Sequence, residues 1–142
     1  MAEYHTTFTV AAPPEDVVAY VADLCNLTQW DSSVRGATLA ADTGPAVGRR
    51  FDVVVGFYGR ELEATYEIIE FDCHSTVAWT IEGKANGVAR VEVTPDGDGS
   101  SVDYRLRLSM RGFARLLDRG LNVALEGIGE NAEKGLQHQF RR

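Results

Sequence analysis

The C-terminal part of the chain, residues 112–142, carries an alternation of apolar and polar side chains with the period of an α-helix. At about 100° per residue, small and aliphatic side chains fall within one arc of about 120°. These are Leu117, Leu121, Ala124, Leu125, Ile128, Ala132 and Leu136. Arg115, Glu126 and Glu133 are among the charged residues on the opposite face. The pattern predicts one long amphipathic helix, and the rest of the chain must supply an apolar surface for it.

Glycines inside this predicted helix are unusual, because each costs about 1 kcal/mol relative to alanine in a helix interior. They are Gly120, Gly127, Gly129 and Gly135. Gly135 lies in the apolar arc beside Ala124 and Ala132. A helix face made of such small residues either packs unusually close to its partner or leaves a space beside it. The sequence leaves both alternatives open.

The first part of the chain predicts a strand and two short helices. Residues 4–11 alternate as a half-buried strand does. Pro13 and Pro14 end that strand and, with two acidic residues directly behind them, mark the start of a helix. This helix is expected to stop near Asp23, and a second short helical turn is predicted over residues 24–30.

From residue 34 onward the period changes to two. Alternating stretches separated by turn signals predict strands in the following places: residues 34–41, 50–57, 61–68, 77–81, 89–93 and 102–108. Hairpin-length loops make the sheet an antiparallel meander, and the alternation indicates that only one of its faces is buried. The long C-terminal helix is expected to cover that face, since no other element is predicted to do so. The chain shows no repeat or linker, which predicts a single domain over residues 1–142.

Composition narrows the possible partners. A net charge of −7 disfavours nucleic acids and anionic membranes, because both attract cationic surfaces. No apolar segment reaches the roughly 20 residues that span a bilayer, and the N-terminus lacks a signal-peptide pattern. Cys25 and Cys73 have neither metal nor redox spacing. We therefore expect a cytoplasmic protein with reduced thiols, as a monomer or a homodimer.

The opening segment carries a resemblance to a known group of proteins. The run from Phe8 to Val17, FTVAAPPEDV, is followed by Asp23 and Trp30. Together with the glycine-bearing last helix, it resembles the START-like or helix-grip superfamily, and most of all its small bacterial polyketide cyclase/dehydrase proteins. The resemblance implies an α+β fold, with a curved antiparallel sheet of about six or seven strands wrapped around a long C-terminal helix. It also implies a cavity between the two.

Bulky side chains on the predicted inner face of the sheet and small ones on the helix are the expected walls of such a pocket. The residues expected to bind a ligand are Phe51, Val53, Phe57, Tyr66, Trp79, Tyr104, Leu117, Leu121, Ala124 and Ile128. A mostly apolar wall with few polar groups suits a small hydrophobic or aromatic molecule. The alternative for each aromatic residue is an ordinary place in a filled core.

Chemistry in the predicted pocket depends on few candidates. Arg60, Tyr66 and Tyr104 are the catalytic candidates, since the resemblance implies that aromatase/cyclases use a pocket arginine and hydroxyl or carboxylate groups. Trp30 is expected to close one end of the cavity, and Asp31 to be a turn or cap residue rather than a general base. The three histidines lack metal-ligand spacing, and no cofactor motif is present, so neither a metal nor a cofactor is expected.

Three functions therefore remain open. The first is carriage or sequestration of a small hydrophobic or aromatic molecule such as a lipid, quinone or polyketide. The second is an enzyme, a polyketide aromatase/cyclase or dehydrase. The third is a protein-interaction module with a filled core. Whether the protein is an enzyme is not decided by the sequence.

Overall fold

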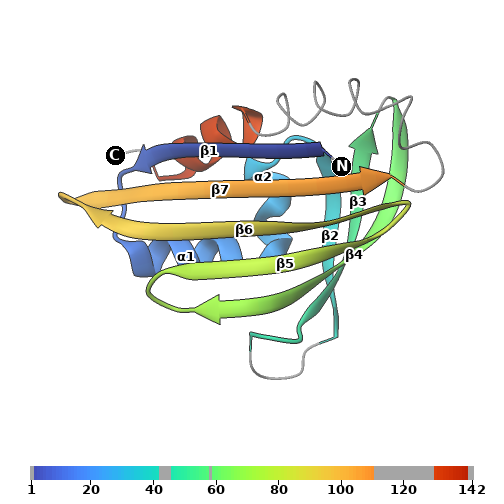
Figure 1. The fold of residues 1–142 in the computed structure, drawn as a ribbon, viewed down its shortest axis with the longest axis horizontal. Helices are drawn as coiled ribbons and strands as arrows, with labels where there is room; N and C mark the ends of the chain where they lie inside the picture. Colours follow the sequence, from blue (N-terminus) through green and yellow to red (C-terminus); the bar gives the residue numbers. More distant parts are fainter. Residues whose placement is uncertain (1, 42–45, 58, 111–129, 141–142) are drawn as a thin grey trace.

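The computed structural model describes residues 2–41, 46–57, 59–110 and 130–140. Seven antiparallel strands form one sheet in the order β1-β7-β6-β5-β4-β3-β2 (Figure 1). Strands β2 to β7 follow one another as a meander, and β1 pairs with β7 at the far edge. The bounds are β1 (Ala2–Val10), β2 (Val34–Ala41), β3 (Arg50–Phe57), β4 (Arg60–Asp72), β5 (Thr76–Gly83), β6 (Ala85–Asp96) and β7 (Gly99–Met110).

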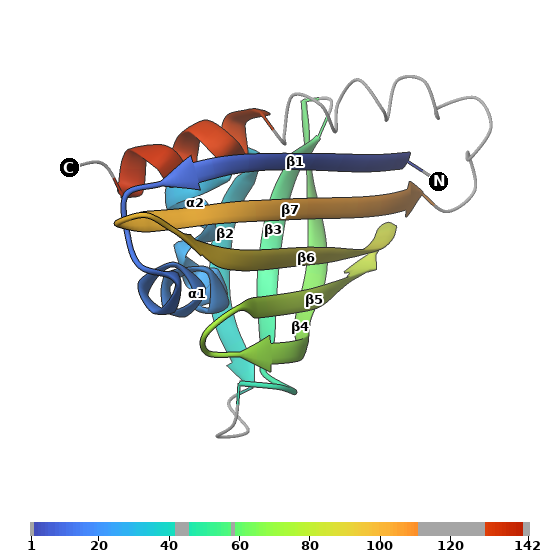
Figure 2. The same cartoon turned by 60° about the vertical axis from the view of Figure 1, so that its left-hand side comes forward.

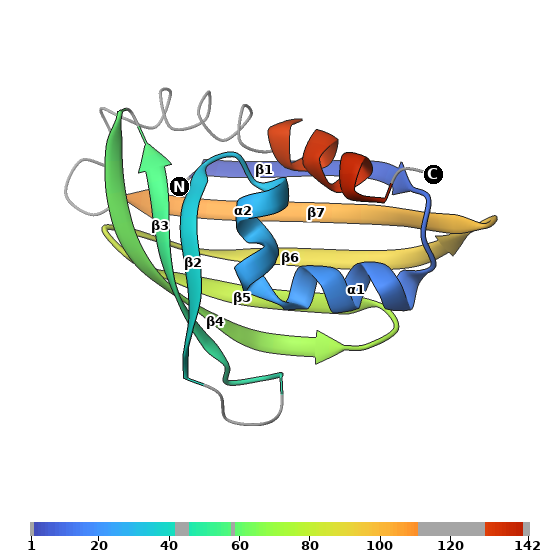
Figure 3. The same cartoon turned by 180° about the vertical axis from the view of Figure 1, so that it is seen from behind.

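The sheet is strongly curved. In Figure 2, β2 and β3 run steeply across the direction of β1 and β7, and the long strand β4 connects the two orientations. The register of β4 against β5 shifts between Ile68 and Glu70, which marks a bulge of the kind that bends a strand. Figure 3 shows the helices gathered on the concave side of this curved sheet. The predicted α+β class and curved antiparallel sheet are confirmed.

Three short helical elements separate β1 from β2: α1 (Pro14–Ala22), the 3₁₀ turn η1 (Leu24–Asn26) and α2 (Leu27–Trp30). Pro14 occupies the first helical position of α1, where its missing N–H costs nothing. At η1, the Asp23 side chain accepts a hydrogen bond from the Cys25 N–H at 3.2 Å. The two short helices predicted after the first strand are therefore present, close to their predicted bounds.

The core lies on the concave face, as the alternation predicted. Tyr66 and Ile68 on β4, and Val91 and Val93 on β6, are buried, whereas their neighbours in sequence are half-buried or exposed. The convex face carries charged pairs instead, such as Arg90 with Glu70 and with Glu92. A residue period of two thus assigns the two faces correctly.

The expectation that only the last helix can cover this face is wrong. Helix α1 contacts β4, β5, β6 and β7, and its residues Val17, Val18 and Val21 are fully buried. The reason is the curvature of the sheet, which brings the ends of these strands around a helix of only nine residues. The concave face is therefore shared between the N-terminal and C-terminal helical elements.

The last helix is described only over residues 130–139. Within it, Ala132 and Leu136 are fully buried, and Lys134 and Gln137 are exposed, which confirms the amphipathic pattern for this part. The remainder of the predicted helix, residues 112–129, lies outside the described residues. At Gly135 the two alternatives are decided in favour of close packing. An added Cβ would overlap the carbonyl oxygen of Trp30 and lie 2.8 Å from its Cα.

Candidate functional site

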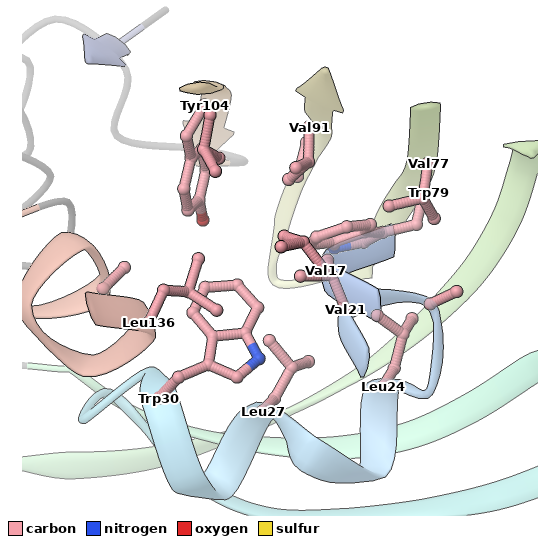
Figure 4. Packing of buried hydrophobic residues seen from close by; sticks show 14 of the residues in the cluster. Val17, Val21, Leu24, Leu27, Trp30, Val77, Trp79, Val91, Tyr104 and Leu136 are labelled. Carbon is pink, nitrogen blue, oxygen red and sulfur yellow. The ribbon is translucent and has the colours of Figure 1, made fainter. Parts of the chain in front are cut away.

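Polar side chains enter the concave interior from three different elements. Asp31 directly follows α2, Tyr66 lies on β4, and Tyr104 lies on β7. All three are buried, with exposed fractions of 7%, 7% and 2%. Trp30 at the end of α2 and Trp79 on β5 are buried in the same core, with exposed fractions of 2% and 1%. The Trp30 ring meets Tyr104, whereas Trp79 lies beside Val77 and Val17 (Figure 4). These five residues define what we call the interior polar cluster.

Asp31 is held by the turn that leads into β2. Its Oδ1 accepts hydrogen bonds from the Ser33 backbone N–H at 3.0 Å and from the Ser33 hydroxyl at 2.6 Å. The backbone carbonyl of Asp31 also accepts from the Val34 N–H at 3.0 Å. Asp31 is thus the turn residue that the sequence predicted. However, burial raises the pKa of its carboxyl group, and the two Ser33 hydrogen bonds oppose that shift only in part.

The two tyrosines keep their hydroxyl protons. Burial raises the pKa of Tyr66 and, well above its ordinary value, that of Tyr104, and the negative charge of Asp31 raises both further. The hydroxyls are therefore neutral at any physiological pH and can donate hydrogen bonds. Figure 4 shows the Tyr104 hydroxyl pointing toward Leu136 and the indole of Trp30. The two rings meet edge to face, with centroids 6.0 Å apart and an interplanar angle of 74°.

The two indole N–H groups of the cluster are buried hydrogen-bond donors. Nε1 of Trp30 and Nε1 of Trp79 are buried, and neither has a hydrogen-bond partner among the described residues. More than nine in ten buried polar groups in folded proteins are paired, so each unpaired donor calls for an explanation. Each is a donor that an acceptor atom of a bound molecule would satisfy.

The structure brings together part of the predicted ligand site. Phe51 and Val53 on β3 are buried on the same face as Tyr66, Trp79 and Tyr104. For Phe57 and Arg60 only the backbone is described. The other four predicted wall residues lie outside the described residues: Leu117, Leu121, Ala124 and Ile128. As ligand contacts, all ten residues stay predictions, and so do the catalytic roles of Arg60, Tyr66 and Tyr104.

Sequence reasoning missed that Asp31 is buried inside this cluster. A signal was available, because Leu27 and Asp31 are four residues apart and share one face of a helical turn. Leu27 is 1% exposed, so this face of the turn lies against the core, and Asp31 is on the same face. The sequence analysis assigned Asp31 to a turn, and the structure shows that this turn faces the core.

Replacement of Asp31 by asparagine is expected to raise stability at neutral pH. The native pKa of Asp31 is raised, so its contribution to stability is complete below about pH 3.9, the ordinary value in an unfolded chain, and is lost as the pH rises through the native pKa. Asparagine accepts both Ser33 hydrogen bonds and carries no charge. Urea denaturation should show D31N more stable than wild type at pH 7 and no longer so at pH 3. A lower stability of D31N at pH 7 would contradict this assignment.

His5 lies at the surface, outside this cluster. His5 pairs with Asp103 at 2.9 Å on the β1–β7 edge of the sheet, and both side chains are partly exposed. Within the described residues, no three histidine, cysteine, aspartate or glutamate side chains gather as a metal site. No helix in the described part of the chain is long and apolar enough to cross a membrane.

One surface groove of about 600 Å³ lies at the far end of β1, next to the β6–β7 turn and the helical segment 130–139. Its lining includes Asp96, Asp98, Gln137 and Phe140. It contains no member of the interior polar cluster. Its polar groups are open to solvent, so nothing in it demands a bound partner.

Comparison with known proteins agrees with this architecture. A family model described as polyketide cyclase / dehydrase and lipid transport matches residues 1–139. No curated protein matches the chain. Solved structures do: the protein TTHA0849 from Thermus thermophilus has a TM-score of 0.84 at 22% identity, covering 97% of this chain and 96% of that protein.

Two further structures extend the comparison. A START superfamily protein from Mycobacterium smegmatis has a TM-score of 0.84 at 15% identity, with 99% and 97% of the two chains covered. The Zhui aromatase/cyclase from a Streptomyces species, strain R1128, has a TM-score of 0.80 at 13% identity, with 96% and 92% covered. At these identities the likeness shows a shared fold.

Proposed function

Because this chain belongs to the polyketide cyclase / dehydrase and lipid transport family, we propose that it binds a small hydrophobic or aromatic molecule. The binding place is the interior between the concave face of the sheet and the C-terminal helix. The observation that carries the proposal is the pair of buried indole donors, on Trp30 and Trp79, that have no partner among the described residues. Each of these donors would be satisfied by an acceptor atom of a bound molecule, which supports the proposal.

Enclosure supplies the binding energy in this proposal. Apolar contact area removed from water stabilises a complex by about 25 cal/mol per Å². Side chains of the core such as Phe51, Val53 and Val91 are already out of water, so the area removed on binding is mainly that of the ligand itself. The polar atoms of Trp30, Trp79 and the two tyrosines then orient the molecule by hydrogen bonds rather than provide most of the affinity.

The chain contains its own reporter for this test, because its two tryptophans, Trp30 and Trp79, both belong to the interior polar cluster. Titration with uncharged aromatic molecules such as naphthol, naphthoquinone and flavonoids is expected to quench or shift the tryptophan fluorescence saturably. Trp30→Phe and Trp79→Phe give the signal of each indole alone. The urea-unfolded protein serves as the control for optical effects of the added compound.

Mass spectrometry of the freshly purified protein provides the complementary measurement. Native conditions are expected to show a bound small molecule that denaturing conditions release. Identical masses in both conditions, combined with no saturable fluorescence change for the whole panel, would overturn the proposed function. The filled-core alternative, a protein-interaction module, would then be the better account.

A second function, that of an aromatase/cyclase or dehydrase, is favoured by one observation. The carboxyl group of Asp31 is buried in the same cluster as the neutral hydroxyls of Tyr66 and Tyr104, and acid–base catalysis needs a titratable group held away from solvent. An enzyme should convert a poly-β-ketone mimic and lose most of that activity in Tyr66→Phe. A carrier should bind the mimic, leave it unchanged, and keep its affinity in the same variant.

A further inference from the structure

Asp31 has an unusual environment for a carboxylate. Among the residues whose side chains the structure describes, it is the one buried aspartate, glutamate, lysine, arginine or histidine. The two described hydrogen bonds of its carboxyl group both come from Ser33, and within the described residues no cation forms an ion pair with it. The carboxyl group is thus held in the interior by hydrogen-bond donors alone, and no described cation offsets the charge of its ionised form.

We propose that Asp31 makes the interior selective for uncharged, hydroxyl-bearing aromatic molecules and rejects carboxylates. This inference rests on the proposed function, because it specifies which molecules the same interior takes. Both Ser33 hydrogen bonds end on Oδ1, so Oδ2 is the atom that we assign to a hydroxyl group of the ligand. A hydroxyl donating to a carboxylate forms a charge-assisted hydrogen bond, which is stronger than a bond between neutral groups.

The other groups of the cluster complete the specificity. Trp30 Nε1, Trp79 Nε1 and the tyrosine hydroxyls are neutral donors, which suit a carbonyl or ether oxygen. They do not offset a second full negative charge beside Asp31. Two carboxylates in one enclosed site cannot both ionise without a large penalty, so fatty acids and aromatic acids are expected to be poor ligands.

A matched ligand pair tests this selectivity. 2-Naphthol and 2-naphthoate share the same ring system, and at pH 7 only the second is charged. Tryptophan quenching gives the dissociation constant of each. An apolar site of any kind disfavours a carboxylate, so a weaker affinity for 2-naphthoate alone is not diagnostic. The diagnostic quantity is the dissociation constant of 2-naphthoate divided by that of 2-naphthol. This ratio in wild type is then divided by the same ratio in D31N.

We expect this ratio of ratios to be about tenfold or more, mainly because D31N binds 2-naphthoate more tightly. Asp52→Asn on the convex face is the matched control, since it removes the same charge from an exposed residue and should leave the ratio unchanged. Asp31→Ser, with circular dichroism as a check of folding, repeats the test should the asparagine variant not fold.

The outcomes separate the two claims. An unchanged ratio in both Asp31 variants, with both ligands bound, overturns the selectivity and leaves the proposed function in place. A ratio that changes equally in Asp52→Asn also overturns it, because the effect would then come from net charge. Failure of every ligand to bind any folded form, together with identical native and denatured masses, overturns the proposed function itself.

Discussion

Replacement of Gly135 by alanine is expected to lower the free energy of unfolding by about 1–3 kcal/mol, although alanine is the better helix former by about 1 kcal/mol. The added methyl group would overlap the backbone carbonyl of Trp30, with the carbonyl carbon and Cα each 2.8 Å from the new Cβ. Backbone atoms cannot rotate out of the way as the end of a flexible side chain can. The helix must therefore move away from α2, and this movement costs more than the helix propensity returns.

Urea denaturation followed by tryptophan fluorescence measures this change. Lys134→Ala is the matched control, because Lys134 lies one residue earlier, on the exposed side of the same helical segment. It also introduces an alanine, but at a position that does not face the core. We expect the control to stay within about 0.5 kcal/mol of wild type. If G135A were as stable as wild type or more so, the close contact between this helix and Trp30 would be contradicted.

The same contact matters for the proposed site. Gly135 packs against the backbone of the residue that directly precedes Asp31, so the C-terminal helix fixes the position from which Asp31 enters the interior. A small displacement of this helix would therefore alter the cluster as well as the stability. Gly135 is conformationally ordinary here, and the absence of a side chain is what the position requires.

Much of this fold could be predicted because strand alternation is local information. Tyr66 and Trp79 were assigned to the buried face from the residues on either side of them, and both are at most 7% exposed. The start of α1 was predicted equally locally, from a proline followed by acids. Such features require no knowledge of what lies across the molecule.

What the sequence did not reveal depends on contacts between distant segments. The pairing of β1 with β7 joins Phe8 to Val102, and no local pattern encodes that choice of neighbour. The cover that α1 provides for the sheet and the contact of Gly135 with Trp30 are of the same kind. The burial of Asp31 follows from them, because a turn becomes part of the interior only when helices and sheet close around it.

Replacement of Trp30 by alanine is expected to cost about 3–5 kcal/mol of the free energy of unfolding. The indole is 2% exposed and packs edge to face against Tyr104, so its removal leaves a cavity in the centre of the core (Figure 4). Its N–H has no partner among the described residues, so the loss is one of apolar packing rather than of a hydrogen bond. Domains of this size are stable by about 5–15 kcal/mol, which makes this a large fraction of the total.

Urea denaturation followed by circular dichroism gives the stability of this variant. Ile69→Ala is the control, because Ile69 is 44% exposed. Its truncation should cost well under half of the free energy that Trp30→Ala costs. A chemical rescue then distinguishes a cavity from a general collapse. A vacated apolar cavity takes up a small aromatic molecule, so free indole is expected to raise the unfolding midpoint of W30A and to leave that of Ile69→Ala unchanged. A cost for W30A no greater than that for the control would contradict the central position of this indole. Rescue by indole would show that the lost stability comes from the vacated indole volume and that the rest of the core keeps its shape.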